Sequence, residues 1–170
     1  MTAAGLVGPL VTAEWPALWP MLQAMGTGSE EPAARARFER LRRDPCWSLV
    51  GCHAGDRLVG YAAAQDRGTH VRTGDEHRTA RLHDLYVDPA VRRQGLGRSL
   101  MAAVVDWAGG RVRYLEWQAH ETRSAPFYLR LGYRGDPCPQ PEYPTFEIDF
   151  GSRPPLEVPQ VGGWPRKPRS

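Results

Sequence analysis

The chain has 170 residues, of which 41% are hydrophobic and 24% charged, and its formal net charge is +3 at pH 7. These values are typical of one globular domain with a substantial core, and no apolar run approaches the roughly 20 residues that a membrane-spanning helix needs. No block of lysine and arginine typical of nucleic-acid binding occurs, and the 3 cysteines lack a Cys-x-x-Cys spacing. The N-terminus lacks the basic region of a signal peptide. We therefore expect a cytoplasmic protein that binds neither a metal, nucleic acid nor a membrane.

The N-terminal half predicts an edge strand, two helices and a hairpin. Residues 6–11 are apolar and contain Pro9, which favours a strand at a sheet edge. A helix should follow, because apolar residues then recur at helical spacing, namely Trp15, Leu18, Trp19, Leu22 and Met25. The two tryptophans in this stripe are expected to pack in the core rather than to stack on a ligand. Residues 29–43 predict a second helix, and the apolar runs 47–53 and 57–64 flank a Gly-Asp turn that indicates a hairpin.

The next elements alternate between strand and helix. Residues 65–79 are polar and indicate a loop, and residues 81–87 form an apolar run that predicts a strand. A helix should extend over about 95–108, where Gly109 and Gly110 end it. Residues 112–118 then predict another strand.

The C-terminal part predicts one more helix and one more strand. Residues 124–131 have a helical pattern, and residues 145–150 alternate strictly between apolar and polar side chains, as a half-buried strand does. Residues 151–170 are rich in proline and predict an extended or disordered tail. Because hairpins and strand–helix units both occur, the sheet should be mixed rather than purely parallel.

A basic turn that contains glycine joins the strand at 81–87 to the helix that follows, and this turn predicts a phosphate site. The first N–H groups of a helix lack internal partners and carry partial positive charge, so they bind anions. We expect the cradle to comprise Arg92, Arg93, Gln94, Gly95, Leu96, Gly97, Arg98 and Ser99, with the two glycines letting a phosphate approach the backbone. The turn lacks the third glycine of the dinucleotide fingerprint and the lysine of a Walker loop.

Two regions resemble the GNAT superfamily of N-acetyltransferases. Arg-x-x-Gly-x-Gly at 92–97, directly after the run Leu-Tyr-Val-Asp-Pro at 85–89, is similar to the acyl-coenzyme-A loop of that family. The segment 115–133, with its Phe-Tyr pair and Leu-Gly-Tyr end, is similar to the family's second signature. The resemblance covers about Leu6 to Phe150. It implies one domain at 1–150 with an α/β (α+β) GNAT fold, in which a mixed sheet of about six to seven strands is flanked by about four helices.

The resemblance also implies how acetyl-CoA would bind. The backbone of Leu85, Tyr86 and Val87 would hydrogen-bond the pantetheine amides, on a strand that carries a bulge in the family. Glu121 stands where the family usually has an asparagine that contacts the pantetheine arm, and a carboxylate offers no donor there unless it is protonated.

Three residues are candidates for proton transfer. Tyr128 matches the tyrosine that commonly lies beside the thioester sulfur, and we assign it as the general acid. Glu116 matches the carboxylate of ribosomal-protein N-terminal acetyltransferases and is our first candidate for the base. His83, where diamine acetyltransferases often have an acid, is the second, and a water chain is a further alternative. Asp84, next to His83, should point to the opposite face of the sheet.

The acceptor of the acetyl group stays open at this point. In this fold the acceptor cleft corresponds to residues 26–32, 65–79 and 136–144. Acids in these loops would attract a cationic amine, although solvated loop acids are commoner; they are Glu30, Glu31, Asp75, Glu76 and Glu142. We expect direct transfer to the primary amine of a small molecule that is polyamine-like, amino-acid-like or aminoglycoside-like. An alternative acceptor is a protein N-terminus or a lysine side chain. An alternative function is a non-catalytic module that binds acyl-CoA. The chain could also form a homodimer.

Overall fold

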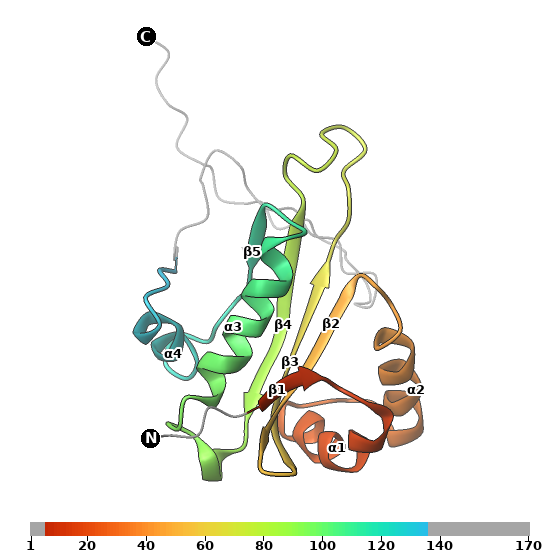
Figure 1. The fold of residues 1–170 in the computed structure, drawn as a ribbon, viewed down its shortest axis with the longest axis vertical. Coiled ribbons are helices and arrows are strands. Elements are labelled where there is room, and N and C mark those ends of the chain that lie inside the picture. Colours follow the sequence, from red (N-terminus) through yellow and green to blue (C-terminus); the bar gives the residue numbers. More distant parts are fainter. Residues whose placement is uncertain (1–5, 136–170) are drawn as a thin grey trace, which may run out of the picture.

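A mixed sheet with helices on both faces makes up the part of the chain that the computed structural model describes, residues 6–135 (Figure 1). The strands are β1 (Leu6–Pro9), β2 (Trp47–Ala54), β3 (Arg57–Asp66), β4 (Thr79–Val87) and β5 (Tyr114–Glu116). The helices are α1 (Trp15–Ala24), α2 (Glu31–Leu41), α3 (Leu96–Gly109) and α4 (Ala125–Arg130), with short 3-10 turns at Thr12–Glu14 and Pro89–Val91. The strand expected at 145–150, the segment 136–144 and the proline-rich tail lie outside the described residues.

The five described strands are ordered β1-β2-β3-β4-β5 in the sheet. The first four pair antiparallel, and β5 pairs parallel to β4 because α3 carries the chain back across the sheet between them. The mixed sheet is thus confirmed, and so is the predicted order of elements as far as α4. The described sheet has fewer strands than the six to seven expected, and β5 is shorter than the strand expected at 112–118.

One face of the sheet is covered by α3 (Figure 1). The buried residues of this helix recur at helical spacing and are Leu96, Leu100, Met101, Val104 and Ala108. They pack against Val59, Ala62, Ala64 and Leu82 of the sheet, all nearly or fully buried. Each large apolar side chain buried in this way stabilises the fold by about 1.5–3 kcal/mol, so this layer fixes where α3 begins and hence where the turn after β4 lies.

The other face of the sheet is covered by α1 and α2. Trp15 is the largest buried side chain here, and its ring contacts Phe38 of α2 at a centroid distance of 5.5 Å. Its indole Nε1 also donates a hydrogen bond to Glu31 Oε1 at 3.0 Å, which joins the two helices. The core position predicted for Trp15 is therefore confirmed. Glu31, one of the acids expected in the acceptor cleft, instead serves as the partner of this indole.

Gly60 allows β3 and β4 to approach each other closely. A Cβ at this position would lie 2.5 Å from the backbone oxygen of Tyr86 and 2.9 Å from Cys52 Sγ. We expect Gly60→Ala to lower the free energy of unfolding by about 1–3 kcal/mol, because overpacking forces the backbone to shift. Urea denaturation measures this change. Gly8→Ala in β1 is the matched control, since a Cβ there has no atom within 4 Å. Equal stability of the two variants would contradict this account of the packing.

Candidate functional site

The turn between β4 and α3 has an unusual backbone that its own hydrogen bonds hold in place. Asp88 Oδ1 accepts the N–H of Ala90 at 2.9 Å, and Arg92 Nε donates to the carbonyl oxygen of Val87 at 2.9 Å. Arg93 has a φ of 65°, in a region that non-glycine residues seldom adopt, and Gly95 has a φ of 86°. Strained backbone of this kind persists where the surrounding structure imposes it, and it is concentrated at functional sites.

The N-terminus of α3 opens onto this turn without a side-chain cap. Gly95 occupies the N-cap position, and no side chain accepts a hydrogen bond from the first turn of the helix. A Cβ at Gly95 would meet no described atom within 4 Å, so the position of the missing side chain at this N-cap is open. The side chains of Arg93 and Arg98 are exposed beside it. Within the part of the chain that the structure describes, the turn therefore combines uncapped backbone donors, a helix dipole and cationic side chains, a combination that suits an anion.

Gly97 has a packing role that the sequence did not indicate. A Cβ at this position would lie 3.1 Å from the ring of Phe127 in α4. The glycine therefore lets α3 pack closely on α4. This packing role stands beside the predicted contact of Gly97 with a phosphate, and Gly95 has the open position.

Among residues 6–135, no strand pairs with the β5-facing edge of β4 beyond Arg81. The two strands pair only through residues 79–81 and 114–116. On the other edge, the N–H of Asp88 donates to the carbonyl oxygen of Val59 at 2.8 Å. Because backbone groups of successive residues turn to opposite edges of a strand, those of Leu85 and Val87 face the open side. An extended ligand that carries two amides can add to this edge as another strand would.

A bulge in β4 turns two consecutive polar side chains to the same face. Ala63 pairs with Asp84 and Ala64 pairs with Leu82, so His83 is the extra residue between them. A bulge interrupts the alternation of side chains between the two faces of a sheet. His83 and Asp84 therefore both face α1 and α2, and the prediction that Asp84 points to the opposite face is wrong.

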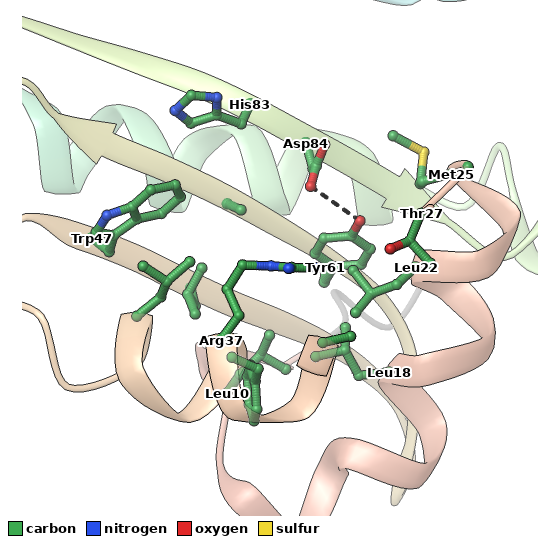
Figure 2. A pocket seen from close by; sticks show the side chains of 16 residues that line it. Leu10, Leu18, Leu22, Met25, Thr27, Arg37, Trp47, Tyr61, His83 and Asp84 are labelled. Carbon is green, nitrogen blue, oxygen red and sulfur yellow. Dashed lines mark hydrogen bonds between the residues drawn. The ribbon is translucent and has the colours of Figure 1, made fainter. Parts of the chain in front are cut away.

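These two residues lie at one end of a pocket of about 410 Å³ between the sheet and the two helices (Figure 2). Most of its lining is apolar and comes from Leu10, Leu18, Leu22, Met25, Ala34, Phe38, Leu41, Trp47, Leu49 and Ala63. The polar side chains are Thr27, Arg37, Tyr61, His83 and Asp84. Of the expected cleft segments, 26–32 contributes Gly26 and Thr27, and 65–79 contributes nothing.

Asp84 and Tyr61 form a hydrogen-bonded pair inside this pocket. The Tyr61 hydroxyl donates to Asp84 Oδ2 at 3.3 Å, and Figure 2 shows both side chains directed toward each other. Burial raises the pKa of Asp84, and the hydrogen bond from Tyr61 opposes part of that rise. Burial together with the nearby carboxylate raises the pKa of Tyr61, so its phenol stays protonated at neutral pH.

His83 is held as a neutral ring at the edge of the same pocket. Its imidazole stacks on Trp47 at a centroid distance of 5.2 Å, and burial, helped by the charge of Arg81, lowers its pKa. Nε2 lies 3.2 Å from Gln65 Oε1. We assign the tautomer from this contact, so that Nε2 carries the hydrogen and donates it to Gln65 Oε1. Nδ1 is then the nitrogen that can accept a proton.

Glu116, the first candidate for the base, is engaged elsewhere. Its Oε1 lies 2.9 Å from Nη1 of Arg67 and 3.8 Å from Nη1 of Arg81, and the side chain does not line the pocket. The acids proposed to attract an amine do not line it either: Glu30 and Glu76 lie outside the pocket, and Asp75 pairs with Arg78. Glu142 lies outside the described residues.

Tyr128 lies on the α3 face of the sheet, in the short helix α4. Its ring packs against Trp117 and Phe127 at centroid distances of 5.2 and 4.9 Å. Burial raises the pKa of Tyr128, so the phenol carries its proton at neutral pH. Glu121 is exposed in the turn that precedes α4.

Sequence reasoning identified His83 and the segment that contains Thr27, but it missed the other polar residues of the pocket. Arg37 and Tyr61 were not singled out as candidate site residues, and Asp84 was expected on the other face. The resemblance implies a bulge on this strand, and the pairing confirms one, but its position at His83 leaves no signal in the sequence, so no pattern could have placed Asp84. Between residues 6 and 135, no group of His, Cys, Asp and Glu side chains is arranged to hold a metal ion, and no helix there is long and apolar enough to cross a membrane.

Known proteins share both the sequence pattern and the fold. The family model described as "Acetyltransferase (GNAT) family" matches residues 15–133. N-alpha-acetyltransferase RimI of Mycobacterium tuberculosis is 31% identical over 113 residues, which are 66% of this chain and 68% of the relative. Matches to three further relatives span less than two thirds of those proteins.

Solved structures resemble the whole domain at low sequence identity. AAC(6')-Iy, solved in complex with the bisubstrate analog CoA-S-monomethyl-acetylneamine, has a TM-score of 0.70 at 18% identity, with 86% of this chain and 99% of that chain covered. Ribosomal-protein-alanine N-acetyltransferase of Brucella melitensis has a TM-score of 0.63 at 19% identity, with 87% and 100% covered. At these identities the likeness establishes the fold and leaves the substrate open.

Proposed function

The chain belongs to the GNAT acetyltransferase family, and we propose that it transfers an acetyl group from acetyl-CoA directly to the primary amine of a small molecule. The observation that carries this proposal is the continuous surface formed by the open edge of β4 and the uncapped N-terminus of α3. It offers strand-like hydrogen bonds to an extended chain and leads that chain to an anion cradle.

The residues present fit acetyl-CoA, which would supply the activated acetyl group. The backbone of Leu85 and the N–H of Val87 would hydrogen-bond the pantetheine amides, with Tyr86 between them, since the carbonyl oxygen of Val87 already accepts from Arg92. The N–H groups and cationic side chains of residues 92–99 would hold the diphosphate. Glu121 is exposed before α4 and would make no donor contact with the pantetheine arm as an ionised carboxylate.

The proposed acceptor site is the pocket between the sheet and the two helices, and the proposed base is His83. An alkylamine with a pKa near ~10 must lose a proton before its nitrogen can attack. The Nδ1 atom of neutral His83 can take that proton, directly or through a water. The amine nitrogen then bonds to the acetyl carbon as the C–S bond breaks, and the second ammonium proton leaves to solvent. We prefer His83 to Glu116 because two guanidinium groups already engage the Glu116 carboxylate.

Tyr128 is the proposed general acid. Its phenol keeps its proton at neutral pH because burial raises the pKa, and it can donate that proton to the departing sulfur. His83 and Tyr128 lie on opposite faces of the sheet, and the open edge of β4 lies between the two faces. This arrangement supports a base and an acid that act on opposite sides of one thioester.

Comparing His83→Gln with Glu116→Gln tests the base. Because the pKa of His83 is lowered, kcat of the native enzyme should rise with pH through a value below the ordinary ~6.5 and level off above it. His83→Gln should remove this acidic limb and lower the plateau by about 100-fold, whereas Glu116→Gln should leave the profile in place. If only Glu116→Gln alters the pH profile of kcat, Glu116 and not His83 is the base. Thiol release from acetyl-CoA, followed by pH, is the measurement.

A protein N-terminus is the second candidate acceptor, favoured by the 31% identity to the N-alpha-acetyltransferase RimI. Thiol release with a panel of small amines and of peptides with free N-termini separates the two. A preference for small amines supports our proposal, and a preference for peptides overturns its acceptor class. Acetyl-CoA binding without thiol release from any amine would indicate a non-catalytic binding module.

A further inference from the structure

We propose that the acceptor is a monoamine with an apolar aromatic or branched aliphatic body, whose ammonium group lies against Asp84 and which Arg37 discriminates from polycations. This inference rests on the proposed function and narrows its substrate class. It excludes the polyamine-like and aminoglycoside-like acceptors that the sequence left open.

The walls of the pocket fit an apolar body. Leu18 and Leu22 of α1, Phe38 and Leu41 of α2, and Leu49 of β2 all line it. Sugar rings carry hydroxyl groups on all sides, and polyamines carry further ammonium groups along a methylene chain; such polar and charged groups lose water in this pocket without gaining partners. A hydrocarbon body gains about fourfold in affinity for each methylene that it buries. The pocket, of about 410 Å³, has room for a small ligand of this kind.

Asp84 is the only carboxylate among the described residues that line the pocket. Its carboxyl group lies at the bulge of β4, next to His83, and the Tyr61 hydroxyl holds it at 3.3 Å. One ammonium group therefore finds one partly buried counter-charge. A second or third ammonium group on the same ligand would have no counter-charge in the described lining.

Arg37 adds a cation to the same pocket. It reaches from α2 toward Tyr61 in Figure 2, and its Nη2 donates to Ser29 Oγ at 3.2 Å. A second ammonium group in the pocket would lie near this guanidinium and be repelled by it. Arg37 thus discriminates against polycations by electrostatic repulsion.

A panel of amines tests the substrate class. We expect kcat/KM for phenethylamine and isoamylamine to exceed that for ethanolamine, putrescine, spermidine and kanamycin by at least about tenfold, because only the first two fill the apolar walls. Higher kcat/KM for a polyamine or for kanamycin would overturn the inference, and so would a preference for peptide N-termini.

A charge reversal tests the role of Arg37. Arg37→Glu should raise kcat/KM for putrescine relative to phenethylamine by about tenfold, since it replaces a repelling charge by an attracting one. Arg35→Glu is the matched control, because it changes the net charge by the same amount. Arg35 is exposed on the same helix and lies outside this pocket. An equal effect of the two substitutions on this ratio would refute the selectivity role.

Failure of this inference is distinguishable from failure of the proposed function. If acetyl-CoA binds and some amine releases thiol, the proposed function holds, and the order of the amines then decides the inference. If no amine in the panel releases thiol, the proposed function fails, and the substrate class fails with it. Asp84→Asn gives a further readout, because KM for phenethylamine should rise while the Kd of acetyl-CoA stays within about twofold.

Discussion

Gly95→Asp is expected to weaken acetyl-CoA binding by about 100-fold, because a carboxylate about 4 Å from a phosphate repels it strongly in a partly desolvated site. Gly95 is the N-cap of α3, and its missing side chain faces open space. An added carboxylate would therefore lie in front of the N–H groups that we expect to hold the diphosphate. Isothermal titration with acetyl-CoA measures the effect.

Gly95→Asn is the matched control for this substitution. Asparagine and aspartate have the same shape, and both tolerate the positive φ of this position better than other side chains do. The two variants therefore share the conformational cost and differ in charge. We expect the asparagine variant to bind acetyl-CoA at least about tenfold more tightly than the aspartate variant. Equal affinities would show that the diphosphate binds elsewhere.

Tyr128→Phe is expected to lower kcat by about 10- to 1000-fold, since it removes the proton donor for the departing sulfur. The ring, and with it the packing against Trp117 and Phe127, is retained. The Kd of acetyl-CoA should consequently stay within about twofold of the native value. Steady-state thiol release gives kcat, and titration gives the Kd.

Tyr133→Phe is the control for the loss of a hydroxyl in the same aromatic cluster. Tyr133 contacts Trp117 edge-on at a centroid distance of 5.2 Å. Its phenylalanine variant should keep nearly full kcat. If both variants lose activity to the same degree, the hydroxyl of Tyr128 has no special part in proton transfer and the assignment of the acid must be withdrawn.

The elements with strong local signals were predictable from the sequence. The order of strands and helices is confirmed as far as α4, and the stripe from Leu96 to Ala108 marks α3 within a residue or two. The turn after β4 was also predictable, since glycine and a basic run between a strand and a helix have a physical meaning without any tertiary context. These signals depend on spacing along the chain.

The composition of the pocket was not predictable, because it depends on contacts between distant segments. The bulge at His83 arises from pairing with β3, and it turns Asp84 to the face opposite to the one that strict alternation predicts. The packing role of Gly97 could not be predicted either, because the residue that it contacts, Phe127, belongs to another helix. Glu116 matches a family pattern, yet it meets Arg67 and Arg81 only when β4 and β5 pair.

Binding of the acetyl-CoA diphosphate by the turn between β4 and α3 is tested most directly by one comparison. Isothermal titration of the native protein with acetyl-CoA and with acetyl-pantetheine, which lacks the diphosphate, isolates the contribution of the cradle. We expect saturable binding of acetyl-CoA at one site per chain and affinity for acetyl-pantetheine weaker by at least about 100-fold. Equal affinities, or no binding of acetyl-CoA at high micromolar concentration, would contradict the claim.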